Sequence, residues 1–155
     1  MSVLRMPLAP LEGRHLLAVV DEYILLLDGP RDDDEALARL SPTAYPDDPE
    51  AADEFRRSTR DEGFDQRRAD ALEVRTGLER FEGERDDGTA VLEVSTAVLD
   101  AWLRTLTGIR LVLASRLGVD RTDAHDPEDV RFGTYDWLGY RLEVLIQLAD
   151  QHDAR

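Results

Sequence analysis

The sequence has 155 residues, of which 42% are hydrophobic, and its 34 acidic and 19 basic side chains give a formal net charge of −15. A chain of this length is expected to form one domain, residues 1–155, with a sizeable core. The lack of cysteine excludes disulfides, thiolate metal sites and cysteine nucleophiles. All the basic residues are arginines, and the negative charge repels phosphate backbones and anionic membranes at long range.

The N-terminal residues do not have the pattern of a secretory signal. Pro7 and Pro10 interrupt their apolar character, and no basic region precedes an apolar core. The longest candidate for a membrane span, residues 15–28, is too short and contains Asp21 and Glu22. We therefore expect a cytoplasmic protein that does not enter membranes.

Residues 1–10 predict an extended segment, and helical patterns follow it. Apolar residues recur every three or four positions from Leu11 to Asp28, which predicts a first helix. Gly29 and Pro30 end that helix. A short helix is expected to follow and to end near Leu40.

Two helices are predicted in the middle of the chain. Asp48 before Pro49 is a strong helix start, and the helix that begins there is expected to run to about Ser58. Thr59 and Glu62 fit a capping box. We therefore expect a second helix to begin at Thr59 and to run to about Arg80, the alternative being that the first helix continues. An exposed turn follows it.

The longest apolar-periodic segment comes next and is expected to form a central helix. Residues 89–94 have β-branched side chains and predict a short strand, either an extended connector or a minor hairpin with the N-terminal residues. Ser95 is the expected N-cap of the central helix and Gly118 its left-handed C-terminal cap. The last helix is predicted from about Gly133 to Gln151. The pattern indicates an all-α, single-domain helical bundle of about four main helices plus short helices, with at most a minor two-stranded β element.

Catalytic and metal-binding patterns are missing from the sequence. His15, His125 and His152 lie far apart, and Glu12 with His15 makes the one Glu-x-x-His, whereas a di-iron bundle needs two. The acidic loops lack the glycine and the glutamate of a calcium-binding EF-hand, and no glycine-rich phosphate loop is present. We expect no enzyme, no metal and no cofactor. The alternative is a small-ligand binder or an enzyme of unknown class, for which a deep pocket with converging polar groups would be the sign.

Direct DNA binding is the other alternative function, through five arginines on the middle helices: Arg56, Arg57, Arg60, Arg67 and Arg68. Between residues 54 and 80, however, seven arginines accompany seven acids, so this segment is locally neutral. Ion pairs within a helix explain such arginines more simply, and the net charge disfavours contact with a phosphate backbone. We do not expect nucleic acid as a partner.

Two tryptophans and one arginine are further structural or interaction candidates. Trp102 is expected in the core, and a homodimer is expected if Trp137, Tyr140 or the apolar side of the last helix stays exposed. Arg110 lies on the apolar side of the central helix, where an unpaired guanidinium is costly. We predict an internal pair with Asp21, with Glu22 or with a backbone carbonyl; the alternative is an anchor for an acidic group of a partner.

Three stretches together carry a family resemblance: RLSPTAYPDDPEAADEFRRSTR (Arg39 to Arg60), AWLRTLTGIRLVLASRLGV (Ala101 to Val119) and YDWLGYRLEVLIQLA (Tyr135 to Ala149). With them the chain resembles an actinobacterial family that is catalogued as a domain of unknown function and encoded beside the Clp protease adaptor. The resemblance implies a helical cytoplasmic protein without enzymatic activity. It also implies a regulatory role, because some relatives are proposed oxidative-stress regulators that work through the transcription machinery.

The cysteine pair with which those relatives sense redox is absent from this chain, so the resemblance carries no thiol sensing over to it. Protein–protein interaction is the part that remains transferable. We therefore predict an uncharacterised, non-enzymatic protein-interaction module, and an accessory role in transcription through a protein partner. Acidic loops or exposed helix faces are expected to contact a basic partner.

Overall fold

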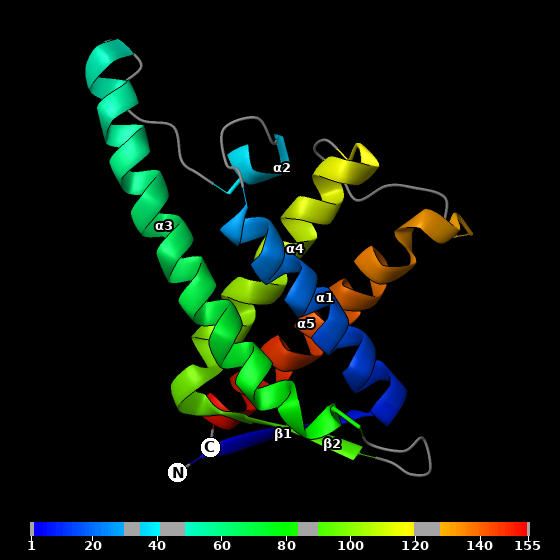
Figure 1. Ribbon diagram of the computed structural model, residues 1–155. Coiled ribbons are helices and arrows are strands. Elements are labelled where there is room, and N and C mark those ends of the chain that lie inside the picture. Colours follow the sequence, from blue (N-terminus) through cyan, green and yellow to red (C-terminus); the bar gives the residue numbers. More distant parts are fainter. Residues whose placement is uncertain (1, 30–34, 41–48, 84–89, 120–127, 155) are drawn as a thin grey trace.

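The computed structural model describes residues 2–29, 35–40, 49–83, 90–119 and 128–154, with the backbone alone described for residues 49–60 and Ala90. Four long helices, one short helix and two strands, joined in places by 3-10 turns (η), make up this part of the chain (Figure 1). In chain order they are β1 (Val3–Leu8), α1 (Pro10–Asp28), α2 (Glu35–Ala38), α3 (Pro49–Leu78), η1 (Glu79–Phe81), β2 (Ala90–Ser95), η2 (Thr96–Val98), α4 (Leu99–Leu117), η3 (Val130–Phe132) and α5 (Gly133–Asp153). The predicted helical bundle with a minor β element is confirmed.

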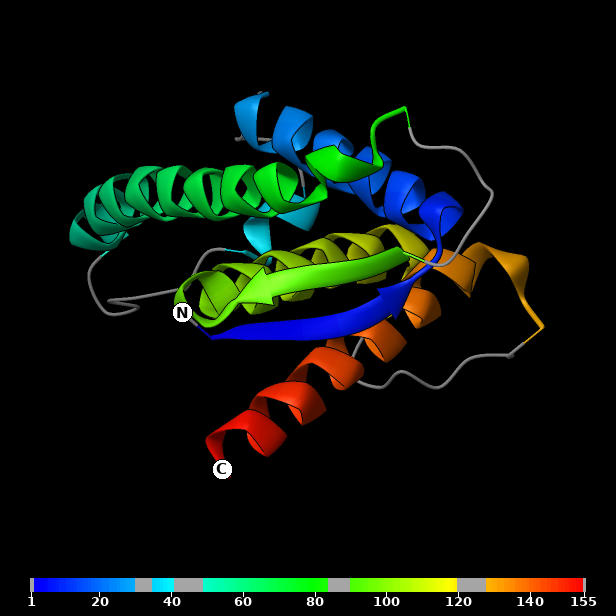
Figure 2. The same ribbon diagram turned by 90° about the horizontal axis from the view of Figure 1, so that it is seen from below.

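The strand β1, near the N-terminus, and the strand β2, from the middle of the chain, form a two-stranded antiparallel sheet. Val3 lies opposite Ser95, and Leu8 lies opposite Ala90. Burial alternates along β1, because Leu4, Met6 and Leu8 point into the core while the residues between them are exposed. Figure 2 shows the strands side by side in front of α4. The β-branched residues thus pair with the N-terminal residues, as predicted, but α1, α2 and α3 separate the two strands in the chain.

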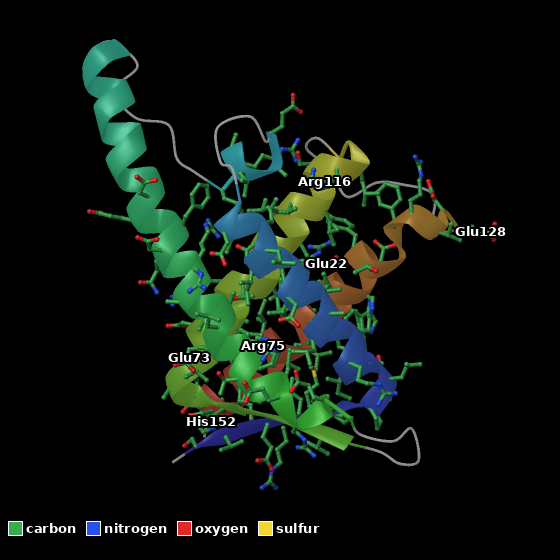
Figure 3. The ribbon with its side chains drawn as sticks, in the orientation of Figure 1. Glu22, Glu73, Arg75, Arg116, Glu128 and His152 are labelled. Carbon is green, nitrogen blue, oxygen red and sulfur yellow. The ribbon has the colours of Figure 1, made fainter. Side chains whose placement is uncertain are left out.

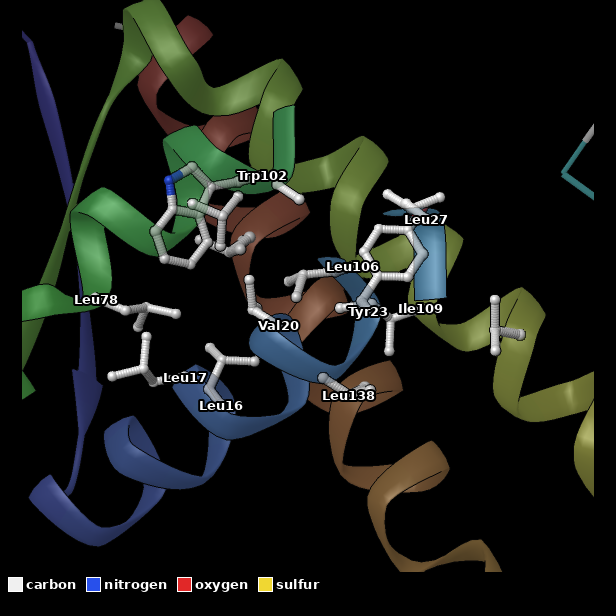
Figure 4. Packing of buried hydrophobic residues seen from close by; sticks show 14 of the residues in the cluster. Leu16, Leu17, Val20, Tyr23, Leu27, Leu78, Trp102, Leu106, Ile109 and Leu138 are labelled. Atoms are coloured by element: carbon white, nitrogen blue, oxygen red, sulfur yellow. The ribbon is translucent and has the colours of Figure 1, made fainter. Parts of the chain in front are cut away.

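The helices enclose one main core. The helix α3 packs against both α1 and α4, and α4 packs in turn against α5. Figure 4 shows side chains of α1, α4 and α5 converging there, among them Val20, Leu106 and Leu138. Trp102 is 1% exposed and belongs to this core, as expected. It fits because Gly77 has no side chain: a Cβ atom there would lie 2.9 Å from Cζ2 of Trp102.

The helix α4 has the two caps that the sequence predicts. The Ser95 hydroxyl accepts a hydrogen bond from the Ala97 N–H at 3.2 Å, and Gly118 ends the helix with a φ of 77°. The first turn, η2, is a 3-10 turn, so the α-helix proper begins at Leu99 rather than Thr96. None of the helices in the described part of the chain has both the length and the apolarity that crossing a membrane requires.

The prediction of two separate helices in the middle of the chain is wrong, because α3 is continuous from Pro49 to Leu78. Gly63 lies in the interior of α3, just before the half of the helix that packs on the core. A glycine there lowers the stability of a helix by only about 1 kcal/mol relative to alanine. Nothing lies within 4 Å of the position that a Cβ at Gly63 would take, so no close packing requires a glycine there. Buried side chains hold the second half: Phe64, Ala71, Val74 and Leu78. At about 1.5 Å per residue α3 is roughly 45 Å long, and Figure 1 shows its N-terminal half extending beyond the rest of the molecule.

A candidate binding groove between α1 and α4

An apolar groove of about 390 Å³ lies between α1 and α4. Its walls come from Val19, Glu22, Tyr23 and Leu26 on α1 and from Ile109, Val112, Leu113 and Arg116 on α4. Glu22 and Arg116 are both exposed, and they are the two charged side chains of the lining. Figure 3 shows them on their two helices. The groove is therefore apolar inside, with one charge of each sign at its walls.

The packing of the helices explains why this space stays open. The closest helix partner of α1 is α3, whereas α4 packs against α3, α5 and α2. The helices α1 and α4 are thus joined through core side chains such as Val20 and Leu106 rather than through close backbone contact. Beyond this shared core, apolar side chains of both helices, including Val19 and Leu113, are left half-buried.

Tyr23 forms part of the groove wall and reaches a buried polar region behind it. Its hydroxyl lies so close to Gly108 that a Cβ atom there would overlap it, and the Arg67 guanidinium lies beside it. Burial raises the pKa of the Tyr23 hydroxyl, and the nearby positive charge of Arg67 opposes this only in part. Arg67 itself donates from Nη2 to the Leu40 carbonyl at 3.1 Å. Arg67 of α3 thus lies behind the groove wall, beside the Tyr23 hydroxyl and near Gly108.

Arg67 and Arg68 are the described members of the proposed DNA-binding stripe, and both contact the protein itself. Arg68 donates from Nε to Asp28 Oδ1 at 2.6 Å, which joins α3 to the end of α1. The backbone of Arg56, Arg57 and Arg60 lies on α3, and their side chains lie outside the described residues. Arg68 therefore joins α3 to α1, and Arg67 joins α3 to the turn that follows α2.

Arg110 lies between α4 and α5. Its Nε donates to the Tyr135 carbonyl oxygen at 3.2 Å, and its guanidinium carbon lies 4.0 Å from the centre of the Tyr135 ring. Gly139 makes room for it, since a Cβ there would come within 3.0 Å of the guanidinium. The sequence allows a carboxylate or a backbone carbonyl as the internal partner of Arg110, and this contact is with a backbone carbonyl. Asp21 binds Arg75, with an Nε–Oδ1 distance of 2.7 Å.

Trp137 is half-buried on α5 and contacts Glu12 of α1. Its Nε1 donates to Glu12 Oε2 at 2.9 Å, and Arg141 donates from Nη2 to the same oxygen at 2.5 Å. The His15 ring lies beside the Trp137 ring at a tilt of 58°, with 5.3 Å between the ring centres. Glu12 and His15, the one Glu-x-x-His of the sequence, thus lie in a contact between α1 and α5. Among the residues with described side chains no group of three acidic or histidine side chains is placed to hold a metal ion.

The fold and this groove define the class: a small helical domain with a two-stranded sheet and an apolar groove between two helices. The family signature of a Domain of unknown function (DUF2017) matches residues 2–149. The chain therefore belongs to the DUF2017 family, and the predicted resemblance to a domain family of unknown function is confirmed to that extent. The comparisons with curated proteins and with solved structures found no match.

The groove is the part of the site that the sequence did not predict. The helical periodicity places Val19, Leu26, Val112 and Leu113 on largely apolar helix faces, and such faces are ordinarily expected to be covered. Nothing in that periodicity says that α1 and α4 leave space between them. The weak signal was Glu22, a charge inside the apolar run of α1.

Proposed function

We propose that this protein is a non-enzymatic module that binds a partner protein in the groove between α1 and α4. The observation that supports the proposal is the groove itself, about 390 Å³ in volume and mainly apolar in its lining. An apolar groove between helices suits the apolar face of a partner's amphipathic helix, whose anchoring side chains are spaced at three or four residues. Small-molecule sites are also mainly apolar and of similar volume, but their few polar groups converge on a ligand that is largely buried. In this groove the two charged side chains, Glu22 and Arg116, are exposed.

The partner in this proposal is basic. With a net charge of −15 the chain attracts positively charged proteins and repels nucleic acids. A basic residue of the partner next to its apolar anchors would face Glu22, which is exposed at the groove. An accessory role in transcription, in the cytoplasm, remains part of the proposal on the strength of the sequence resemblance alone.

Site-specific photocrosslinking in the native host tests the proposal. A photoreactive amino acid at Leu113, which lines the groove, is expected to give a defined adduct with one partner protein. The matched control carries the same amino acid at Glu73, an exposed position on α3 outside the groove lining (Figure 3). Equal adducts from both positions, or none from either, would count against the groove as the binding site.

A further inference from the structure

Only alternate residues of β1 hydrogen-bond to β2. The Thr96 N–H donates to the Ser2 carbonyl at 3.0 Å, which identifies these two residues as a hydrogen-bonded pair. Because such pairs alternate in an antiparallel ladder, every second residue of β1 binds β2: Leu4, Met6 and Leu8. The N–H and C=O groups of Val3 and Arg5 therefore point away from β2.

Two side-chain contacts agree with this assignment. Pro7, which has no N–H, falls in the outward-pointing set, and its carbonyl accepts a hydrogen bond from Arg141 Nη1 at 3.1 Å. Val91 lies opposite Pro7 on β2, and its carbonyl accepts from Arg80 Nη1 at 2.7 Å. Arginines thus bind outward backbone groups at one end of the sheet. At the other end, no described residue outside the sheet hydrogen-bonds to the backbone of Val3 or Arg5.

A second groove, of about 290 Å³, lies beside this unbound stretch of strand. Its lining comes from β1 and α5: Val3, Leu4, Arg5, Leu148, Gln151 and His152. Figure 2 shows α5 diverging from β1 towards the start of the strand, and Figure 3 shows His152 beside that start. The outward backbone groups and the groove therefore occur at the same place.

We propose that the edge of β1 at Val3 and Arg5 is a docking site for an extended, basic segment of a partner protein, which adds there as a third strand. Sheet edges recognise extended peptides in this way, with backbone hydrogen bonds for affinity and neighbouring pockets for side chains. Val3, which is exposed, and Leu148, which is half-buried, offer the apolar contact in the groove. The net charge of −15 favours a basic segment and opposes pairing with a second copy of the chain. This surface is separate from the α1–α4 groove and does not depend on it.

The structure offers a matched pair of variants at Arg5. Because the Arg5 N–H is not part of the β1–β2 ladder, Arg5→Pro removes one outward donor and no ladder hydrogen bond, as Pro7 does naturally. Arg5→Ala keeps this N–H. Both variants lose the Arg5 side chain and its 3.5 Å ion pair with Glu93, so they differ chiefly in the backbone donor.

The probe is a peptide of alternating valine and lysine, Val-Lys-Val-Lys-Val-Lys, with both ends blocked, titrated into the full chain and followed by backbone amide NMR. We expect the Val3 and Arg5 amides to shift and to exchange more slowly with solvent. The Arg5→Ala variant should bind at least as tightly as the wild type, because it loses a positive charge at the edge and frees Glu93 from its ion pair. Arg5→Pro should bind about tenfold more weakly than Arg5→Ala, since a peptide carbonyl loses its donor.

Equal binding by the two variants, or amide shifts confined to other elements, overturns the proposal, and so does the absence of binding at millimolar peptide. Protection of the same amides that rises with protein concentration alone would show a second copy as the occupant instead. Replacing lysine by glutamate in the peptide should weaken binding, and unchanged binding refutes the basic character of the segment. If Arg5→Pro does not fold, Val3→Pro and Val3→Ala provide the same comparison at the neighbouring outward position.

Discussion

At the scale of single residues, glycines set how closely the elements approach one another. A Cβ atom at Gly13 would overlap the ring of Phe81, which is fully buried against α1. Gly13→Ala is therefore expected to lower the free energy of unfolding by about 2 kcal/mol, because the ring or the helix has to move. Gly63→Ala, in open space on α3, should instead raise it by up to about 1 kcal/mol. Urea unfolding of both variants measures the difference, and a loss of stability in Gly63→Ala equal to that in Gly13→Ala would contradict this account.

Glu12 is a second residue whose contacts give a prediction, here on pH dependence. Burial raises the pKa of Glu12, but hydrogen bonds from Trp137, Arg141 and the Ala9 N–H outweigh it, so the pKa in the folded state is lowered. The unfolded chain then binds more protons than the folded one at mildly acidic pH. The stabilisation by Glu12 is present above the ordinary glutamate pKa of about 4.3 and is lost as the pH falls through the lowered value.

Glu12→Gln should accordingly cost about 1–2 kcal/mol of unfolding free energy near neutral pH, since charged hydrogen bonds are replaced by weaker ones. The difference in unfolding free energy between variant and wild type should become smaller below about pH 4, where Glu12 of the wild type takes up a proton. Chemical denaturation at a series of pH values measures this gap. A gap that stays constant down to pH 3 would show that the carboxylate charge does not matter.

At the scale of elements, α3 and α4 are joined by a buried carboxylate. Asp70 is 5% exposed and receives two hydrogen bonds from Arg104, Nε–Oδ2 at 2.9 Å and Nη2–Oδ1 at 3.1 Å. Gln66 donates to the same carboxylate at 3.0 Å. Because the Arg104 side chain is 54% exposed, solvent screens part of the attraction.

A double-mutant cycle with Asp70→Asn and Arg104→Gln should therefore give a coupling energy of about 1 kcal/mol, more than an exposed pair and less than a fully buried one. The exposed pair of Arg5 and Glu93 serves as the reference, with an expected coupling below about 0.5 kcal/mol. Urea unfolding of the single and double variants gives both values. A coupling energy between Asp70 and Arg104 no larger than that between Arg5 and Glu93 would mean that burial of the Asp70 carboxylate does not strengthen the α3–α4 contact.

The elements also show which features the sequence could predict. The caps of α4, the extent of α1 and α5, and the β1–β2 pairing depend on local signals such as Ser95 and Gly118, and all of them are present in the structure. The interruption of α3 was predicted wrongly, because a local capping pattern at Thr59 does not show that the helix continues through it. The sequence leaves Asp21, Glu22 and a backbone carbonyl open as partners of Arg110. It cannot choose among them, since Tyr135 lies 25 residues away and its position depends on the packing of α5 on α4.

At the scale of the whole molecule, two grooves lie apart on a strongly acidic chain. The α1–α4 groove exists because α1 and α4 share core side chains without close backbone contact, and the β1 groove because α5 diverges from the strand. Neither could be predicted from periodicity, which reports the apolar face of each helix and not the distance between helices. Net charge, by contrast, is known from the sequence alone, and it favours a basic partner at both surfaces.

The central claim is that a partner protein binds in the α1–α4 groove. The most direct test repeats the photocrosslinking in a variant whose groove is filled by a larger side chain. The photoreactive residue stays at Leu113 on one wall, and Val19→Trp on the opposite wall fills the space between them. The adduct formed by the protein without the filling substitution should be lost, while the thermal unfolding transition stays within a few degrees. An undiminished adduct from the folded, filled variant would show that the partner binds elsewhere.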